Sequence, residues 1–465
     1  MDVPWSSTAW RRVLVYGLGL SGTAAAAFLR RRGVEVVGVD ARAAADLDLG
    51  ALVGDAGFSV LPGGEPSTLP DGIDGVVLSP GVPGDRPLVV DARGRGVPVI
   101  AEVELAFPFL AGPVVGITGS NGKSTTTAMT GHLLAGAGIP VEVCGNIGLP
   151  LTAVADGEPG RTFVVELSSF QLETTDTFRP RAAALLNLSP DHLDRYADMG
   201  GYAAAKQRIF RRQGDREVAV LNADDAAVAG LAVPSRRRFF SRLTAVADGC
   251  SLVGDEVIEA GSDRDRVLFV AADVSLPGPH HLENAMAASL LAMAAGVPAA
   301  SLAPSLRTFK GLPHRTEPVG EVGGVRYFDD SKGTNVGATA KALEGFADDT
   351  VHLILGGRGK GTGLGVELVD LIRRKVRRAY LIGEEAARFG RELEGVVPLH
   401  RSLRLEVAVA EAAAAASDGD VVLLSPACAS FDQFRNYHHR GEVFQHLVRG
   451  LTGGVPGESS REARH

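Results

Sequence analysis

The chain has 465 residues, of which 45% are hydrophobic and 22% charged. This length exceeds that of one ordinary domain and predicts about two to four domains. Its net charge of −8 argues against a nucleic-acid partner, so the arginine runs at 30–32 and 236–238 are interpreted as solvated faces. Three cysteines without metal or redox spacing, no apolar run of roughly 18 residues and no secretory pattern predict a soluble, cytoplasmic protein without membrane insertion.

The first hundred residues alternate between strand and helix patterns. Strands are predicted over 13–16, 34–39 and 75–78, and a helix over 21–32. A strand, a glycine-rich turn, a helix and a second strand in this order form a βαβ unit.

A second series begins at residue 113. A strand over 114–117 runs into a glycine loop, and a helix is predicted from Lys123. Further predicted elements are strands at 163–165, 182–186 and 217–221, short strands and turns over 235–275, and a helix over 281–295.

A third series follows the Gly-Leu-Pro at 311–313. Its strands are predicted over 325–328, 351–355, 379–382 and 421–424, and the tail from 453 is expected to fray. The simplest reading is three α/β domains over 1–101, 102–311 and 312–465.

The loop after residue 117 has the composition of a phosphate-binding loop. Its glycines let backbone N–H groups surround phosphate oxygens, and the following helix adds a positive end. Lys123 would reach the β- and γ-phosphates, and the Ser124 hydroxyl would hold Mg²⁺. The pattern is irregular, since Ile117 stands where a glycine is usual, and the alternative is a glycine-rich turn with a surface lysine. The predicted ATP-binding positions are Gly116, Thr118, Gly119, Ser120, Asn121, Gly122, Lys123, Ser124 and Thr125.

A second glycine motif lies near the N-terminus. The run from Gly17 to Gly22 matches the dinucleotide fingerprint, and Asp40 follows at the distance of a ribose-binding carboxylate. A helix N-terminus can receive any diphosphate, so the motif leaves both an NAD-dependent dehydrogenase and a UDP site open.

Three residues after the loop could complete a phosphoryl-transfer site. Glu166 ends an apolar strand, where a carboxylate could hold Mg²⁺, and His192 follows another strand as a possible second ligand. Lys206 lies in a predicted helix over 202–210. A lysine cation repels Mg²⁺, so its own chemistry favours a solvated helix residue.

Six segments, taken in chain order, jointly resemble the Mur ligase family over nearly the whole chain. They are 116–125 (GITGSNGKST), 166–173 (ELSSFQLE), 191–196 (DHLDRY), 311–315 (GLPHR), 330–335 (DSKGTN) and 425–434 (SPACASFDQF). The second and last segments are most similar to members that join D-glutamate to UDP-N-acetylmuramoyl-L-alanine in peptidoglycan synthesis. The resemblance implies a Rossmann-like UDP-binding domain, a central P-loop ATPase-like domain with a mainly parallel sheet, and a Rossmann-like C-terminal domain for glutamate. It also implies a monomer that uses ATP and two Mg²⁺ ions.

The resemblance also implies roles for individual residues. Lys206 corresponds to a lysine that CO₂ carbamylates, which turns a cation into a metal-binding anion. The implied catalytic residues are Lys123, Glu166, His192 and Lys206, and the metal ligands are Ser124, Glu166, His192 and carbamylated Lys206. The implied contacts of the UDP-substrate are Leu20, Ser21, Asp40, Arg42, Gly81, Asn146 and His192. The implied further ATP contacts are Asn284, Arg315 and Asp330. The implied glutamate contacts are Lys332, Thr334, Lys360, Ser430 and Phe431.

Four positions depart from the family pattern. His281 stands where asparagine is common, Arg358 where an acidic residue is common, and Ala41 where a hydroxyl residue is common. Tyr437 replaces a frequent phenylalanine, a change expected to be mild because its ring can pack in the same way.

Three other functions stay open at this point. A dehydrogenase would use the Gly17–Gly22 turn and leave Lys123 unexplained. A nucleotide switch or assembly ATPase would keep the phosphate loop without needing an amino acid. Relatives that add other amino acids, or glutamate to folate, are the third alternative, and the 425–434 segment is unlike theirs.

Overall fold

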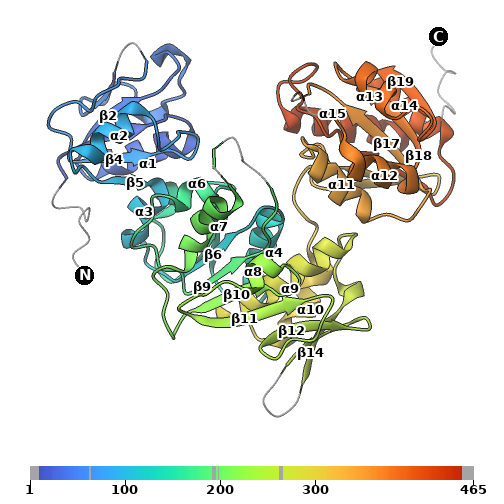
Figure 1. Cartoon of the computed structure of the whole chain (residues 1–465), viewed down its shortest axis with the longest axis horizontal. Helices are drawn as coiled ribbons and strands as arrows, with labels where there is room; N and C mark the ends of the chain where they lie inside the picture. Colours follow the sequence, from blue (N-terminus) through green and yellow to red (C-terminus); the bar gives the residue numbers. More distant parts are fainter. Residues whose placement is uncertain are drawn as a thin grey trace, which may run out of the picture. The chain divides into compact units, whose positions relative to one another are not determined.

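The computed structural model describes residues 10–61, 64–190, 195–196, 198–260, 265–359, 361 and 363–452. The chain divides into two compact units, each described here by itself (Figure 1). Unit 1 contains Met1–Val274 and Leu282–Phe309, and unit 2 contains Ser275–His281 and Lys310–His465.

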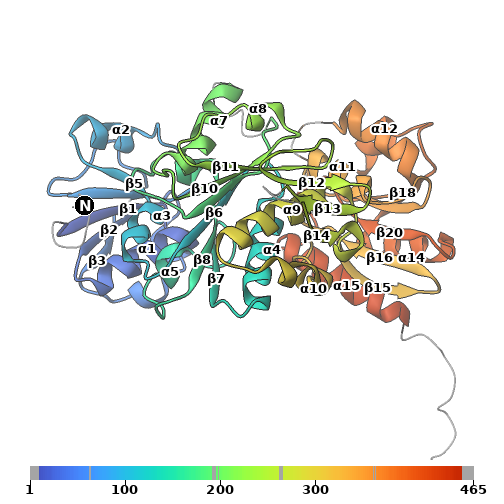
Figure 2. The same ribbon diagram turned by 90° about the horizontal axis from the view of Figure 1, so that it is seen from below.

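The first sheet of unit 1 has five parallel strands in the order β3-β2-β1-β4-β5. Its elements are β1 (Arg12–Tyr16), α1 (Leu20–Arg31), β2 (Glu35–Val39), β3 (Phe58–Val60), β4 (Gly75–Leu78), α2 (Pro87–Gly94), β5 (Val99–Ala101) and α3 (Glu102–Ala106). Helices α1 and α3 cover one face and α2 the other (Figure 2). Strands β1 and β4 are almost wholly apolar because both of their faces are covered.

The central sheet has nine strands in the order β14-β13-β12-β11-β10-β9-β6-β8-β7. The strands from β7 to β12 are parallel, and β13 and β14 add an antiparallel edge. The strands are β6 (Val114–Thr118), β7 (Val141–Gly145), β8 (Thr162–Glu166), β9 (Ala182–Leu185), β10 (Val218–Asn222), β11 (Arg236–Ser241), β12 (Gly249–Val253), β13 (Glu256–Glu259) and β14 (Arg266–Val270). The helices are α4 (Lys123–Gly136), α5 (Leu151–Val154), α6 (Ser169–Leu172), α7 (Met199–Gln207), α8 (Ala226–Ala229), α9 (Pro279–Ala294) and α10 (Leu302–Thr308).

One hydrophobic core joins these two sheets. Phe28 of α1 and Val103 of α3 belong to the same buried cluster as Leu151 of α5 and Phe163 of β8. Glu104 strengthens the junction, since its carboxylate accepts backbone hydrogen bonds from residues 177 and 178. The first two sheets therefore form one compact unit.

Unit 2 contains a six-stranded sheet in the order β15-β16-β20-β17-β18-β19, parallel except for β15. Its elements are β15 (Glu317–Val322), β16 (Val325–Asp329), α11 (Val336–Glu344), β17 (Val351–Gly356), α12 (Gly365–Lys375), β18 (Val376–Ile382), α13 (Ala386–Glu392), β19 (Leu399–Leu403), α14 (Leu405–Ala415), β20 (Val421–Leu424) and α15 (Tyr437–Thr452). Helices α11, α12 and α13 cover one face, and α14 and α15 the other.

The α/β class with mainly parallel sheets is confirmed, whereas the predicted domain boundaries at 101 and 311 stay predictions. Each predicted strand is present within one to three residues of its expected ends. Among the helices in the described part of the chain, none combines the length and apolar character needed to cross a bilayer.

Candidate active site

The predicted phosphate loop connects the centre of the largest sheet to a helix. Strand β6 lies between β8 and β9, and α4 begins at Lys123 directly after the loop. Gly122 has a left-handed backbone with φ of 80°, and a side chain there would overlap the Asn284 amide oxygen. Gly116 lies inside β6 with Ile209 against it, so it belongs to the strand that precedes the loop.

The loop is held in shape by the segment that follows β9. The Asn187 carbonyl accepts from the Ser120 N–H at 3.0 Å, and its side-chain oxygen accepts from the Asn121 N–H at 2.8 Å. Lys123 Nζ donates to the Gly119 and Ser120 carbonyls, both at 2.9 Å, and so curls over its own loop. Ser124, predicted to hold Mg²⁺, is buried in the first turn of α4.

Glu166 occupies the carboxyl end of β8, beside the strand that leads into the loop. Its side chain is 2% exposed, and its Oε1 accepts a 2.9 Å hydrogen bond from Asn146. The second carboxylate oxygen, Oε2, is buried without a hydrogen-bond partner among the described residues. Since a buried carboxylate oxygen needs a partner, this atom suits a metal ion.

Lys206 is buried, with only 1% of its surface exposed. Its Nζ donates to the Gly119 carbonyl at 2.8 Å and lies 4.6 Å from the centre of the Tyr202 ring. The interpretation of Lys206 as a solvated helix lysine is therefore wrong, because α7 faces the phosphate loop here. Lys123 and Lys206 both donate to the same Gly119 oxygen, which brings two amine groups close together.

Residues 168–171 of the 166–173 segment form the start of helix α6. Ser168 caps α6, since its hydroxyl accepts from the Gln171 N–H at 3.2 Å and the Gln171 side-chain oxygen accepts from the Ser168 N–H at 3.0 Å. Beyond this cap, Phe170 stacks on the Arg195 guanidinium, and Glu173 pairs with Arg195 at 2.9 Å. These side chains line a cleft of about 1010 Å³ that also includes Gly81, one of the predicted UDP-substrate contacts.

The N-terminal glycine turn is built around Asp40. The Leu18 N–H donates to Asp40 Oδ2 at 2.7 Å, and Arg42 Nε donates to Oδ1 at 3.0 Å. The Arg42 hydrogen bond holds the pKa of Asp40 at about 2, so the carboxylate is charged and fixes the turn. Leu20 is exposed at the start of α1, beside this turn.

Asn284 and the two other predicted ATP contacts lie in different units. Asn284 belongs to unit 1, where its amide oxygen accepts from Thr126 at 3.2 Å. Arg315 and Asp330 belong to unit 2. Asp330 accepts from Ser425 at 2.7 Å and from the Thr316 N–H at 3.1 Å, and burial raises its pKa to about 7. His192 and Lys360 lie outside the described residues.

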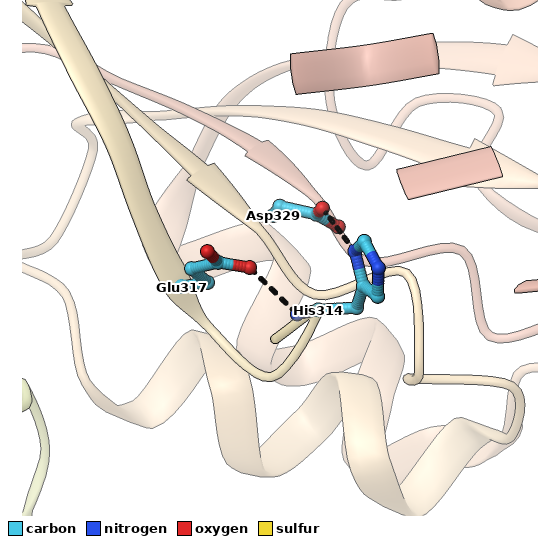
Figure 3. Close-up of side chains that lie close together, drawn as sticks. All are labelled: His314, Glu317 and Asp329. Atoms are coloured by element: carbon cyan, nitrogen blue, oxygen red, sulfur yellow. Dashed lines mark hydrogen bonds and ion pairs between the residues drawn. The ribbon is translucent and has the colours of Figure 1, made fainter. Parts of the chain in front are cut away.

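A buried hydrogen-bond network holds the turn that carries Arg315. His314 Nδ1 and Asp329 Oδ2 are 2.7 Å apart, and the His314 N–H donates to Glu317 at 2.8 Å (Figure 3). Gln445 donates to both carboxylates at 3.0 Å. The hydrogen bond to Asp329 raises the pKa of His314. His314, Glu317 and Asp329 are close enough to hold a cation, but these partners already explain the cluster as a structural network.

One of the predicted glutamate-binding residues of unit 2, Lys332, lies at the start of α15. Lys332 Nζ donates to the Tyr437 hydroxyl at 2.8 Å and lies 4.1 Å from the centre of that ring. Thr334 follows in the same loop, and its N–H donates to the Lys332 carbonyl at 2.8 Å. Ser430 is buried and Phe431 is 62% exposed. The tyrosine at position 437, where phenylalanine is frequent, therefore adds a polar contact with Lys332. The expectation of a mild change considered only how the ring packs.

Arg440 is a site residue that the sequence analysis missed. It is fully buried, and its guanidinium donates to the carbonyls of Ser331 at 2.8 Å and Cys428 at 3.1 Å. These bonds tie the Lys332 loop to the segment that carries Ser430. A signal was present, because Arg440 shares a four-residue spacing with the buried Phe444 and Val448 of α15. Arg358, another departure, pairs on the surface with Glu384 at 2.9 Å.

Comparison with known proteins identifies all three parts of the chain. The model of the MurD-like N-terminal domain of Mur ligases matches residues 11–101, the Mur ligase middle domain matches 117–292, and the Mur ligase glutamate ligase domain matches 314–428. A UDP-N-acetylmuramoylalanine–D-glutamate ligase of Acidobacterium capsulatum is 45% identical over 95% of this chain and 97% of its own length. The protein of the same name from Koribacter versatilis is 44% identical over 95% and 98%.

Solved structures share the fold. The UDP-N-acetylmuramate-alanine ligase MurC of Thermotoga maritima has a TM-score of 0.58 at 19% identity, over 94% of this chain and 99% of that one. The MurF ligase of Thermotoga maritima in complex with ADP has a TM-score of 0.56 at 18% identity, over 97% and 100%. The chain, with its phosphate loop, buried Glu166 and buried Lys206, thus belongs to the Mur ligase family of enzymes.

Proposed function

We propose that this enzyme joins D-glutamate to UDP-N-acetylmuramoyl-L-alanine in peptidoglycan synthesis, with conversion of ATP to ADP and phosphate. The observation that carries the proposal is a phosphate loop in which Lys123 and Lys206 both donate to the Gly119 carbonyl, next to the strand that ends at Glu166. Relatives 42–45% identical over nearly the whole chain carry the name of this activity. The MurF structure with bound ADP supports the use of an adenine nucleotide.

The reaction proceeds in two steps that separate activation from coupling. The alanine carboxylate attacks the γ-phosphorus of ATP, which breaks the bond to ADP and gives an acyl phosphate. The deprotonated amine of D-glutamate then attacks the acyl carbon, and inorganic phosphate leaves from a tetrahedral intermediate. Activation is needed because oxide is a poor leaving group, whereas phosphate is a good one.

The loop residues position the triphosphate for the first step. Lys123 now donates to two loop carbonyls and would turn toward the β- and γ-phosphates once these arrive. The N-terminal end of α4 adds partial positive charge at the same place. Asn284, beside Gly122, and Asp330 would contact the adenine and ribose, and Arg315 would contact the phosphates.

The residues at the loop suit Mg²⁺, and the family resemblance implies two ions. Glu166 Oε2, which lacks a hydrogen-bond partner among the described residues, offers one oxygen, and the Ser124 hydroxyl, His192 and a carbamate on Lys206 would supply the others. Carbamylation adds CO₂ to the neutral amine with release of a proton, and it relieves the contact of two amines with one carbonyl. Bound Mg²⁺ would neutralise the charge that develops on the transferred phosphoryl group.

Each of the three predicted domains would bind one of the three substrates. Domain 1–101 would bind the UDP-substrate through Leu20, Ser21, Asp40, Arg42 and Gly81, with Asn146 at the sugar. Domain 102–311 would bind ATP. Domain 312–465 would bind glutamate through Lys332, Thr334, Lys360, Ser430 and Phe431. We further propose a monomeric, cytoplasmic enzyme.

An ADP-release assay tests the proposal. The protein is incubated with UDP-N-acetylmuramoyl-L-alanine, ATP and a panel of amino acids, and only D-glutamate should stimulate release. Activity with L-lysine or meso-diaminopimelate in its place would overturn the substrate assignment. Phosphate release that is independent of both substrates would indicate a nucleotide switch, and stoichiometric binding of NADH in a fluorescence titration would indicate a dehydrogenase.

A further inference from the structure

Two adjoining cavities lie at the amino ends of the central strands. One has a volume of about 500 Å³ and the other about 310 Å³. Arg181 and Arg216 line both cavities, so they form the wall between them. Arg179 completes the larger cavity, and Arg236 and Arg238 the smaller one. No step of the proposed ligase reaction uses these residues.

The strand order explains why the arginines gather there. Arg181 directly precedes β9, Arg216 lies two residues before β10, and Arg236 is the first residue of β11. The Val218 N–H donates to the Arg181 carbonyl at 3.1 Å, and the Arg236 N–H donates to the Glu217 carbonyl at 3.1 Å. Adjacent parallel strands are about 4.8 Å apart, so the starts of β9, β10 and β11 bring these arginines into a short row at one end of the sheet.

The row carries positive charge that its neighbours do not balance. Arg179 pairs with Glu217 at 2.8 Å, and Arg238 pairs with Glu259 at 2.6 Å. For the other three arginines, Arg181, Arg216 and Arg236, the described residues provide neither an ion pair nor a side-chain hydrogen bond. All three are exposed at the surface of a chain whose net charge is −8. Three like charges on one cavity wall repel each other, and a bound anion would relieve that repulsion.

We propose that Arg181, Arg216 and Arg236 form a second anion site, which binds the diphosphate group of a small ligand. Guanidinium groups match phosphate oxygens in a planar, two-pronged geometry, which favours phosphate over a monovalent anion. The smaller cavity, of about 310 Å³, suits a small molecule. The site is distinct from the phosphate loop, because that loop follows the carboxyl end of β6, about 16 Å along a five-residue strand.

Isothermal titration with inorganic pyrophosphate tests the site. A variant without the three arginines keeps the phosphate loop and the predicted UDP site of the wild type, so a difference in pyrophosphate binding between the two proteins reports on the three arginines alone. Wild-type protein should bind one pyrophosphate that depends on these arginines. The triple variant Arg181→Gln, Arg216→Gln, Arg236→Gln should bind it at least about tenfold more weakly. Arg237→Gln is the matched control, since Arg237 is exposed on the same strand but lines neither cavity, and it should change the affinity less than about twofold.

The outcomes separate this site from the proposed ligase function. Equal pyrophosphate binding by the wild type and the triple variant, or equal losses in the triple variant and in Arg237→Gln, would overturn the second site. A loss of about tenfold caused by the same three substitutions in a Lys123→Ala background would support it independently of the phosphate loop. Competition by UDP for the arginine-dependent binding would identify a nucleoside diphosphate as the source of the diphosphate group, and failure to compete for it would identify free pyrophosphate. Unchanged melting temperature and ADP affinity establish that the triple variant is folded.

Discussion

The substitution Tyr437→Phe tests whether the tyrosine positions Lys332 for glutamate. It removes only the hydroxyl that accepts the 2.8 Å hydrogen bond from Lys332 Nζ, and it keeps the ring 4.1 Å from that nitrogen. A hydrogen bond to a charged group contributes about 1.5–3 kcal/mol when it is well buried. Both side chains are half-buried, so we expect the loss of this hydrogen bond to cost about 1–1.5 kcal/mol of transition-state stabilisation. This corresponds to a roughly five- to tenfold loss of kcat/KM for D-glutamate.

The assay varies D-glutamate at saturating ATP and UDP-substrate and follows ADP release. The KM for ATP should stay unchanged, since the lost contact lies at the predicted amino-acid site. Tyr327→Phe is the control, because it makes the same change in β16 of the same unit, where Tyr327 packs in the core. Wild-type kinetics toward D-glutamate in Tyr437→Phe would refute the positioning role, and an equal loss in Tyr327→Phe would show a general effect of such substitutions.

Three further predictions concern buried charged groups. Lys206→Ala should lower activity more than about a hundredfold, with partial rescue by short carboxylates, because it removes the proposed metal-binding carbamate. Arg440→Leu should lower the free energy of unfolding by about 3–5 kcal/mol in urea titrations, since buried carbonyls lose their donor. Burial raises the pKa of Glu102 to about 7, so the folded state keeps a proton that the unfolded chain releases above about pH 4.5. Wild-type stability should therefore fall as pH rises from 4.5 to 7, and Glu102→Gln should remove this fall, with a gain of up to roughly 3 kcal/mol at pH 8.

Each of these three predictions has a result that would contradict it. Full activity of Lys206→Ala would exclude a metal role for the residue. Arg435→Leu, an exposed change near the start of the same helix, should leave stability within about 0.5 kcal/mol, and a loss as large as that of Arg440→Leu would refute the buried-donor argument. For Glu102, a stability difference between wild type and Glu102→Gln that is the same at pH 5 and pH 8 would mean that the carboxyl keeps an ordinary pKa.

The predicted strands and helices agree with the structure because their signals are local. Apolar runs such as 114–117 and 351–355 form buried parallel strands, and the change from strand to glycine loop to helix at Lys123 can be seen within a dozen residues. The hydrogen bonds of Arg440 show what local sequence signals cannot predict. Its partner Ser331 lies 109 residues away, and only the fold brings the two together.

By itself, the sequence determined the α/β class, the order of the strands and helices along the chain, and the position of the phosphate loop. These depend on the periodicity of apolar residues and on glycines whose backbone conformation is set within a few residues. Tertiary structure alone decided which polar groups are buried. Lys206 reaches Gly119 across 87 residues, and its 1% exposure comes from elements that are distant in the chain. Desolvation depends on every neighbour in space, so no local pattern could separate this lysine from a solvated one.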